Sequence, residues 1–125
     1  MKKLFSILMV LFAFLSLGFT KVDAAEIKAA NAMHILVPTE QQAIEIRNEI
    51  LQGETQMAVF NNFRNAAKKY SKCSSGLSGG GLGWFGKGDM VPAFEQAAFT
   101  IPAGQVSEPV KTQFGWHLIY VISKK

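Results

Sequence analysis

The amino-acid sequence predicts an α+β domain in which helices pack over a small, mainly antiparallel sheet. Two apolar segments with the character of buried strands lie near the two ends of the domain, and the segments that follow the first of them have helical spacing. A long glycine-rich stretch shows neither period. The expected order is one strand, two helices, a loop, a short helix and two strands, which favours a layered α+β arrangement.

The beginning of the chain has the features of an export signal. Two lysines precede an apolar, uncharged run over residues 4–19, and Val22 with Ala24 provides the small residues that signal cleavage requires. We expect a signal peptide over residues 1–24 and one domain over residues 25–125. The apolar run is shorter than the roughly 20 residues of a spanning helix. An uncleaved signal that tethers the domain to the membrane is the alternative.

Charge and cysteine content exclude several classes of function. Of 13 basic and 9 acidic residues, three and one lie in the signal, which leaves the domain with a net charge of +2. Without a basic stripe, nucleic acid is not an expected partner. The single cysteine, Cys73, cannot form an internal disulfide, so it is either a small buried side chain or a thiol with a chemical task.

The first strand and first helix follow each other directly. Residues 32–37 are uniformly apolar, which predicts a central strand covered on both faces, and Pro38 ends it. Thr39 and Gln42 form a capping box that starts a helix. Gly53 is the expected left-handed residue just beyond the end of that helix.

A second helix is predicted over residues 57–70, and a long loop over residues 71–88. The helix has an apolar stripe at helical spacing, formed by Val59, Phe63, Ala66, Ala67 and Tyr70. The loop contains seven glycines and has no hydrophobic period. Compact domains seldom contain so long a loop without a functional reason.

The remaining elements are short. Pro92 suits the first turn of a helix over residues 91–99. Residues 105–112 predict a strand that Pro109 interrupts, so this strand belongs at an edge or a bulge of the sheet. After a turn, residues 116–122 form a final buried strand.

The two histidines of the chain lie in the first and last strands. Strand alternation places His34 on one face of the first strand and His117 on one face of the last. If these strands are neighbours, the imidazoles can meet beneath the long loop. A buried imidazole needs a hydrogen-bond partner, so a structural pair without chemical role is one reading.

Cys73 together with two histidines permits sharper readings. One is a cysteine hydrolase or transferase, although nothing obvious supplies the orienting carboxylate or amide. Another is a His/His/Cys metal site, although the usual short ligand spacings are absent. The glycine-rich stretch matches neither common phosphate-binding motif. We therefore expect no cofactor and no metal. Leu82, Met90 and Phe94 could equally form core or line an apolar pocket.

Four segments, taken together and in order, resemble the parvulin-type peptidyl-prolyl cis-trans isomerases. They are NAMHILV, FRNAAKKYSKCSSG, GGGLGWFGKGDMVPAFEQAAF and SEPVKTQFGWHLIYV, and they cover nearly all of residues 32–123. The resemblance implies a four-stranded antiparallel sheet surrounded by helices, and it makes residues 25–125 a parvulin-like isomerase domain. Gly81 stands where the family's motif has aspartate.

The resemblance also implies a set of site residues. The expected catalytic residues are His34, Cys73, His117 and Thr112, and the expected substrate-binding residues are Leu82, Met90, Phe94 and Phe114. Phe114 stands where some relatives have serine and many bacterial members have phenylalanine.

The substrates and the location follow from the resemblance and the signal. We expect proline-containing polypeptides, above all unfolded secreted proteins, to bind a monomer that is exported to the periplasm or the cell exterior. Phosphate-directed relatives have a lysine and arginine cluster after the first strand, whereas here no base precedes Arg47. Selection for phosphoserine is therefore not expected. A polypeptide-binding chaperone with little isomerase activity is the alternative function.

Overall fold

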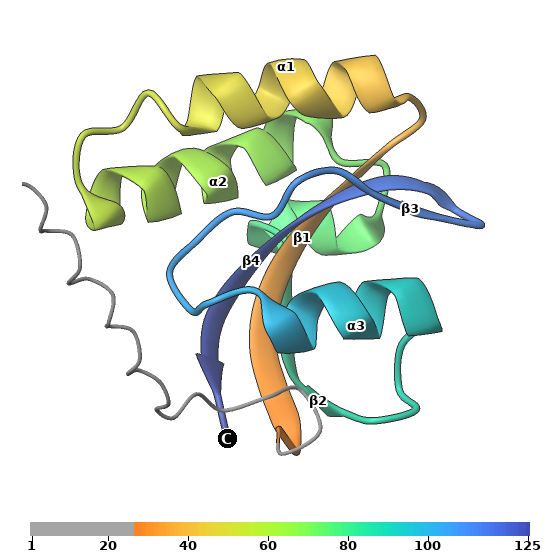
Figure 1. The fold of residues 1–125 in the computed structure, drawn as a ribbon. Coiled ribbons are helices and arrows are strands. Elements are labelled where there is room, and N and C mark those ends of the chain that lie inside the picture. Colours follow the sequence, from red (N-terminus) through yellow and green to blue (C-terminus); the bar gives the residue numbers. More distant parts are fainter. Residues whose placement is uncertain (1–26) are drawn as a thin grey trace, which may run out of the picture.

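The computed structural model describes residues 27–125, so the predicted signal peptide over residues 1–24 lies outside the described residues. The described part is one antiparallel sheet with helices on both faces (Figure 1). This confirms the predicted fold class. No helix within residues 27–125 is long and apolar enough to cross a membrane.

The sheet has four strands in the order β2-β1-β4-β3, and every neighbouring pair is antiparallel. The strands are β1 (Ala29–Val37), β2 (Gly81–Gly86), β3 (Val110–Thr112) and β4 (Gly115–Lys124). The two predicted buried strands, β1 and β4, are the central neighbours. Their pairing places His34 opposite Ile119 and Leu36 opposite His117.

Strand alternation divides the core into two layers. On β1, Met33, Ile35 and Val37 pack against the first two helices, whereas Ala30 and Ala32 pack on the other face against the third helix. Both faces of the strand are covered, which explains its uniformly apolar sequence. His34 has the same parity as the two alanines, so the alternation puts it on the face of the third helix.

The helices are α1 (Glu40–Ile50), α2 (Gln56–Tyr70), α3 (Pro92–Thr100) and the short 3-10 helix η3 (Ser74–Ser78). The Thr39 side chain accepts a hydrogen bond from the Gln42 N–H, as the capping box predicts. The prediction for Gly53 was wrong, because Leu51 ends α1 in a right-handed conformation. Gly53 is small because a Cβ there would lie 2.9 Å from the Val59 nitrogen in α2.

The predicted loop over residues 71–88 contains two elements that the sequence did not indicate. Helix η3 follows Cys73, and β2 forms an edge of the sheet by pairing with β1. Three of the six residues of β2 are glycine, which hides the strand from a propensity argument. Gly80 just before it has φ of 87°, and a Cβ there would lie 2.5 Å from the His34 carbonyl oxygen.

The strand predicted over residues 105–112 is shorter than expected. Only Val110–Thr112 form β3, and Val106 makes an isolated bridge to Tyr120. Pro109 interrupts the ladder because it has no N–H to donate. The position of β3 at the edge of the sheet agrees with the prediction.

The glycine at position 80 yields a stability test. We expect Gly80→Ala to lower the free energy of unfolding by about 2–3 kcal/mol, because the backbone is left-handed and the new methyl meets β1. Gly81→Ala is the matched control, since a Cβ there has its nearest neighbour 3.9 Å away. Urea unfolding measures both. Equal stabilities of the two variants would contradict the close approach.

Candidate active site

An apolar cavity of about 450 Å³ opens on the α3 face of the sheet. Its lining residues come from β1, β2, β4, the loop around Cys73, the turn between β3 and β4, and α3 with the segment that leads into it. They are His34, Leu36, Cys73, Leu82, Asp89, Met90, Val91, Phe94, Phe114 and His117. The structure thus brings seven of the eight predicted site residues to one cavity. The eighth, Thr112, reaches the cavity through a hydrogen bond to His117.

The two histidines meet across the central strands. Nδ1 of His34 lies 3.1 Å from Nδ1 of His117 in a buried hydrogen bond, and the ring centroids are 5.3 Å apart. One nitrogen must donate and the other must accept, so at most one ring can be an imidazolium. Phe94 packs edge-on against both rings at 5.5 Å and 5.2 Å.

A hydroxyl ends the histidine pair on each side. Ser75 Oγ lies 3.1 Å from Nε2 of His34, and Thr112 Oγ1 lies 2.8 Å from Nε2 of His117. The Phe114 N–H donates to Thr112 Oγ1. The Thr112 hydroxyl can still either donate its proton to Nε2 of His117 or accept a proton from it. Two arrangements of protons satisfy all these contacts, and they differ by a shift of every proton along the chain of four side chains.

Both histidines are neutral at pH 7. Burial, followed by the charge of His117, lowers the pKa of His34 from 6.5 to about 4. Burial also lowers the pKa of His117. We call this pair, His34 and His117, the floor of the cavity. The floor is uncharged at pH 7, so it has no imidazolium that could protonate a ligand.

Cys73 lines the cavity with a free, partly buried side chain. Its backbone N–H donates to Ser71 Oγ, which fixes the start of η3. Within residues 27–125, the histidine nitrogens bond to each other, to Ser75 and to Thr112, and none of them bonds to the thiol. The thiolate–imidazole pair of a cysteine hydrolase is not formed.

Sequence reasoning missed four site residues, which are Leu36, Ser75, Asp89 and Val91. Asp89 is held in place because its Oδ2 accepts the Gly86 N–H at 2.8 Å. Ser75 occupies the first half of η3, a helix that the sequence did not predict. Leu36 had a sequence signal in its position two residues after His34 on the same strand. The signal for the other three was their nearness to Cys73 or Met90.

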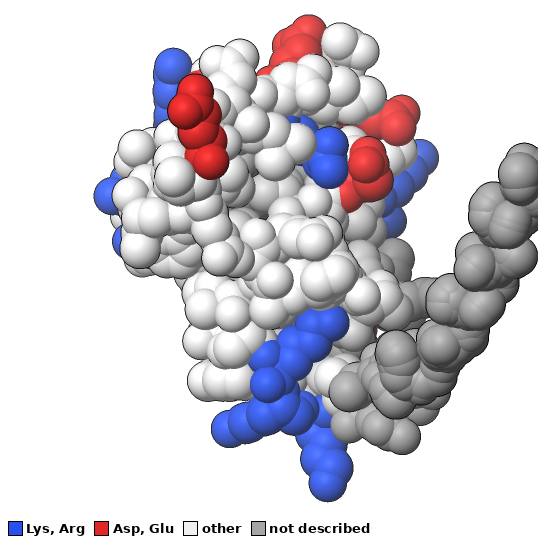
Figure 2. Space-filling view, turned by 60° about the vertical axis from the view of Figure 1, so that its left-hand side comes forward, with Lys and Arg blue, Asp and Glu red and all other residues white. Residues whose placement is uncertain are grey.

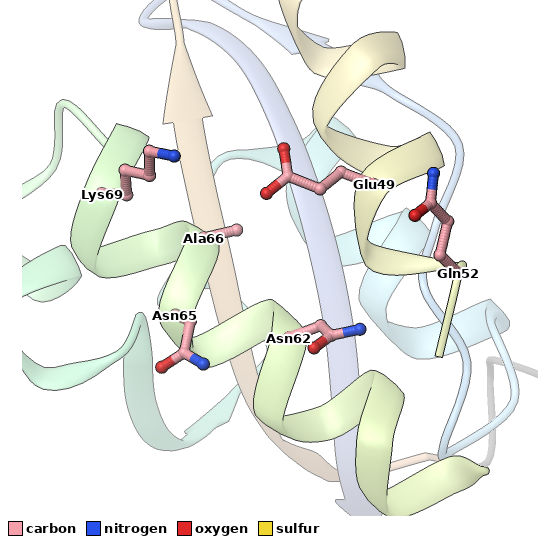
Figure 3. A pocket seen from close by; sticks show the side chains of 6 residues that line it. All are labelled: Glu49, Gln52, Asn62, Asn65, Ala66 and Lys69. Carbon is pink, nitrogen blue, oxygen red and sulfur yellow. The ribbon is translucent and has the colours of Figure 1, made fainter. Parts of the chain in front are cut away.

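A second hollow of about 420 Å³ lies between α1 and α2 (Figure 3). Its lining is polar and consists of Glu49, Gln52, Asn62, Asn65, Ala66 and Lys69. Two of these groups join the two helices, since the Asn62 side chain donates to the Ile50 carbonyl and Glu49 accepts from the Tyr70 hydroxyl. We therefore place the candidate active site in the apolar cavity.

The chain is similar to a known protein family and to several known proteins. A family model for rotamases, described as the PPIC-type PPIase domain, matches residues 24–123. The chain is 46% identical over 95 residues to the foldase protein PrsA of a Geobacillus species, which covers 75% of this chain and 32% of that protein. It is 42% identical over 101 residues to the chaperone SurA of Chromobacterium violaceum, which covers 74% and 22%.

One similar solved structure is a domain of about the same length as the matched part of this chain. NmPin, the parvulin of Nitrosopumilus maritimus, superposes with a TM-score of 0.65 at 38% identity, which covers 77% of this chain and 97% of that one. This chain spans about a third or less of the two curated relatives but nearly all of that solved domain.

The neutral histidine pair predicts a pH dependence of stability. The folded-state pKa of His34 lies below 6.5, so the unfolded chain binds the proton more tightly and stability falls as the pH drops from 6.5 toward 4. We expect the free energy of unfolding to be about 2 kcal/mol lower at pH 5 than at pH 7.5. Urea unfolding at the two pH values measures the difference.

The control is the double variant His34→Gln, His117→Gln, which removes both titrating rings. Its stability should change much less between the two pH values than that of the wild type. Equal stability of the wild-type chain at both values would contradict the neutral pair.

Proposed function

The chain belongs to the rotamase family of PPIC-type peptidyl-prolyl isomerase domains. We propose that it rotates the X-Pro bonds of unfolded, exported polypeptides without covalent chemistry. The resemblance inferred from the four sequence motifs is confirmed. The chain is a peptidyl-prolyl cis-trans isomerase domain, and the proposal concerns its substrates and the roles of its residues.

The reaction needs a lower barrier and little else. Resonance stiffens the X-Pro amide, which rotates over a barrier of about 18–20 kcal/mol. The two isomers differ by only about 0.5–1 kcal/mol. No bond forms or breaks, so an enzyme that binds the twisted amide more tightly than the planar one is sufficient.

The observation that carries the proposal is the apolar cavity above a neutral floor. Leu82, Met90 and Phe94 hold the proline ring and exclude water. The planar amide is the more polar form, so a dry site disfavours it relative to the twisted form. The histidine pair shapes the electrostatics around the carbonyl without delivering a proton, and it holds Phe94 in place.

Cys73 contributes to this environment as a polar wall of the cavity. A covalent role would require an activated thiolate, and no histidine nitrogen lies in hydrogen-bond contact with the thiol. Thr112 and Ser75 act as positioning residues for the imidazoles. Phe114 is 61% exposed beside the cavity, where it can cover a bound peptide.

Two observations support substrates without phosphate. Arg47 Nε donates to the Ser107 carbonyl at 2.8 Å, and its guanidinium also pairs with Glu108 at 3.5 Å. Asp89 adds a carboxylate to the cavity lining, which repels an anion. A phosphoserine before proline would therefore lack the arginine that its charge needs.

Unfolded secreted proteins are the proposed substrates in the periplasm or the cell exterior. The export signal predicted from residues 1–24 and the foldase and chaperone names of the relatives support this location. The alternative is that the domain holds unfolded chains with little turnover. The name of the SurA relative favours that alternative.

Truncation of the pocket tests the role of the apolar wall. We expect Met90→Ala to lower kcat/KM for an unphosphorylated X-Pro peptide roughly 10- to 100-fold, because the side chain that contacts the ring is lost. Met57→Ala is the matched control, since Met57 is 66% exposed and lies outside the cavity. A protease-coupled isomerisation assay measures both. Equal activity of the two variants would remove the pocket from the mechanism.

Replacement of the thiol tests the noncovalent route. We expect Cys73→Asp to keep turnover within roughly tenfold of the wild-type value, because no step depends on a nucleophile. The same assay, with circular dichroism to verify folding, measures the effect. Complete loss of turnover in a folded variant would instead indicate thiol chemistry.

A matched peptide pair tests substrate selection. An unphosphorylated Ser-Pro peptide should turn over faster than its phosphoserine counterpart, because the phosphate meets Asp89 without a free arginine to neutralise it. The ratio of the two kcat/KM values is the readout. Faster turnover of the phosphorylated peptide would contradict this part of the proposal.

A further inference from the structure

The apolar cavity has a single ionic side chain in its lining. Among the lining residues, all of which lie within residues 27–125, Asp89 is the only Asp, Glu, Lys or Arg. The two histidines of the floor are neutral at pH 7, because burial lowers their pKa values. The charge that a bound peptide meets in the cavity is therefore negative, and it comes from one carboxylate.

The Asp89 carboxylate is held in a fixed position. Its Oδ2 accepts the Gly86 N–H at 2.8 Å, and the Asp89 backbone N–H donates to the Gly86 carbonyl at 3.2 Å. Gly88, with φ of 88°, provides the left-handed residue that this turn after β2 contains. Because the carboxylate is already ordered, little conformational entropy is lost when it binds a partner.

Asp89 also has unused capacity for hydrogen bonds. A carboxylate can accept about four of them, and the Gly86 N–H uses one. No ion pair between two residues of the range 27–125 includes Asp89, and its Oδ1 forms no hydrogen bond with them. Lys87, which is nearby in the sequence, does not line the cavity. A cation that arrives with the substrate can therefore pair with Asp89.

The overall charge of the domain does not favour basic substrates. Residues 25–125 have a net charge of +2. On the face shown in Figure 2, most of the surface belongs to residues that are neither acidic nor basic. A preference for a positively charged peptide would therefore have to come from a local group and not from the field of the whole domain.

We propose that Asp89 selects substrates with a lysine or arginine beside the proline. This inference rests on the isomerase function, in which the proline ring contacts Met90, the residue after Asp89. Consecutive Cα atoms are about 3.8 Å apart, so a side chain next to the bound proline lies within reach of the carboxylate. The methylene stem of a lysine can lie on the apolar lining while its ammonium stays beside the exposed Asp89.

The test compares peptides that differ in one residue. Lys, Gln or Glu stands directly before the proline in one series and directly after it in a second series. An NMR exchange assay without protease measures kcat/KM for isomerisation. In at least one series the Lys peptide should turn over on the order of 10-fold faster than the Glu peptide, because attraction in one and repulsion in the other add. The difference should shrink at 1 M salt, where the Debye length is about 3 Å.

Two substitutions and a control assign the selection to Asp89. Asp89→Asn keeps an oxygen for the Gly86 N–H but removes the charge, so it should make the Lys and Glu peptides equal. Asp89→Lys should reverse their order. The ratio of two rates within one variant cancels any general loss of activity. Glu95→Gln is the matched control, because Glu95 accepts the Gly88 N–H of the same loop and does not line the cavity. It also loses one negative charge, and it should keep the wild-type ratio.

The outcomes separate this inference from the isomerase function. Equal turnover of the Lys and Glu peptides by the wild-type chain would overturn the selection and leave the isomerase function in place. An equal loss of selection in Asp89→Asn and Glu95→Gln would overturn it as well, because the general charge of the domain would then be the cause. If no peptide turns over, a chemical-shift titration decides. Tighter binding of the Lys peptide would support recognition by Asp89 without isomerisation, and equal binding would overturn both proposals.

Discussion

The hydrogen bond between His34 and His117 is the contact on which the rest of the site depends. It joins the two central strands on the α3 face, where both imidazoles are largely buried at the base of the cavity. Each ring has only one further nitrogen, and the hydroxyls of Ser75 and Thr112 satisfy these nitrogens. Through those hydroxyls the pair fixes both η3 and the turn between β3 and β4. The walls of the cavity are therefore positioned by its floor.

This constraint also determines what chemistry the site can perform. Burial keeps both rings uncharged, and their mutual hydrogen bond prevents them from sharing two protons at the contact. Phe94 packs edge-on against both rings. Such a floor suits a reaction in which a bond is rotated and no bond is broken. The Cys73 side chain lines the same cavity, and no histidine nitrogen of residues 27–125 forms a hydrogen bond with its thiol.

Much of the fold could be predicted from the sequence, because the central elements have strong periodic patterns. The centres of β1 and β4 are mostly apolar, and α2 has a clear apolar stripe, so local pattern and tertiary role agree. β2 could not be predicted, because its glycines carry no pattern and its existence depends on pairing with β1. Gly53 was misread for a related reason. Its role is close packing against α2, which no local signal records.

The site residues, like the fold, could be predicted only in part from the sequence. Strand alternation allowed His34 and His117 to meet if the two strands were neighbours, and the family resemblance gave roles to Cys73 and the pocket residues that the sequence had singled out. Ser75 and Asp89 are positioned by a 3-10 helix and by a backbone N–H contact, which only the folded chain contains.

The measurement that tests the central claim most directly is the pH profile of kcat/KM on an unphosphorylated X-Pro peptide. A neutral floor and a noncovalent route predict a flat profile from pH 5.5 to 8.5. A change in rate with an apparent pKa near 6.5, the ordinary value of histidine, would contradict the account. It would show that an imidazole of the floor becomes charged in the range in which the account has both rings neutral.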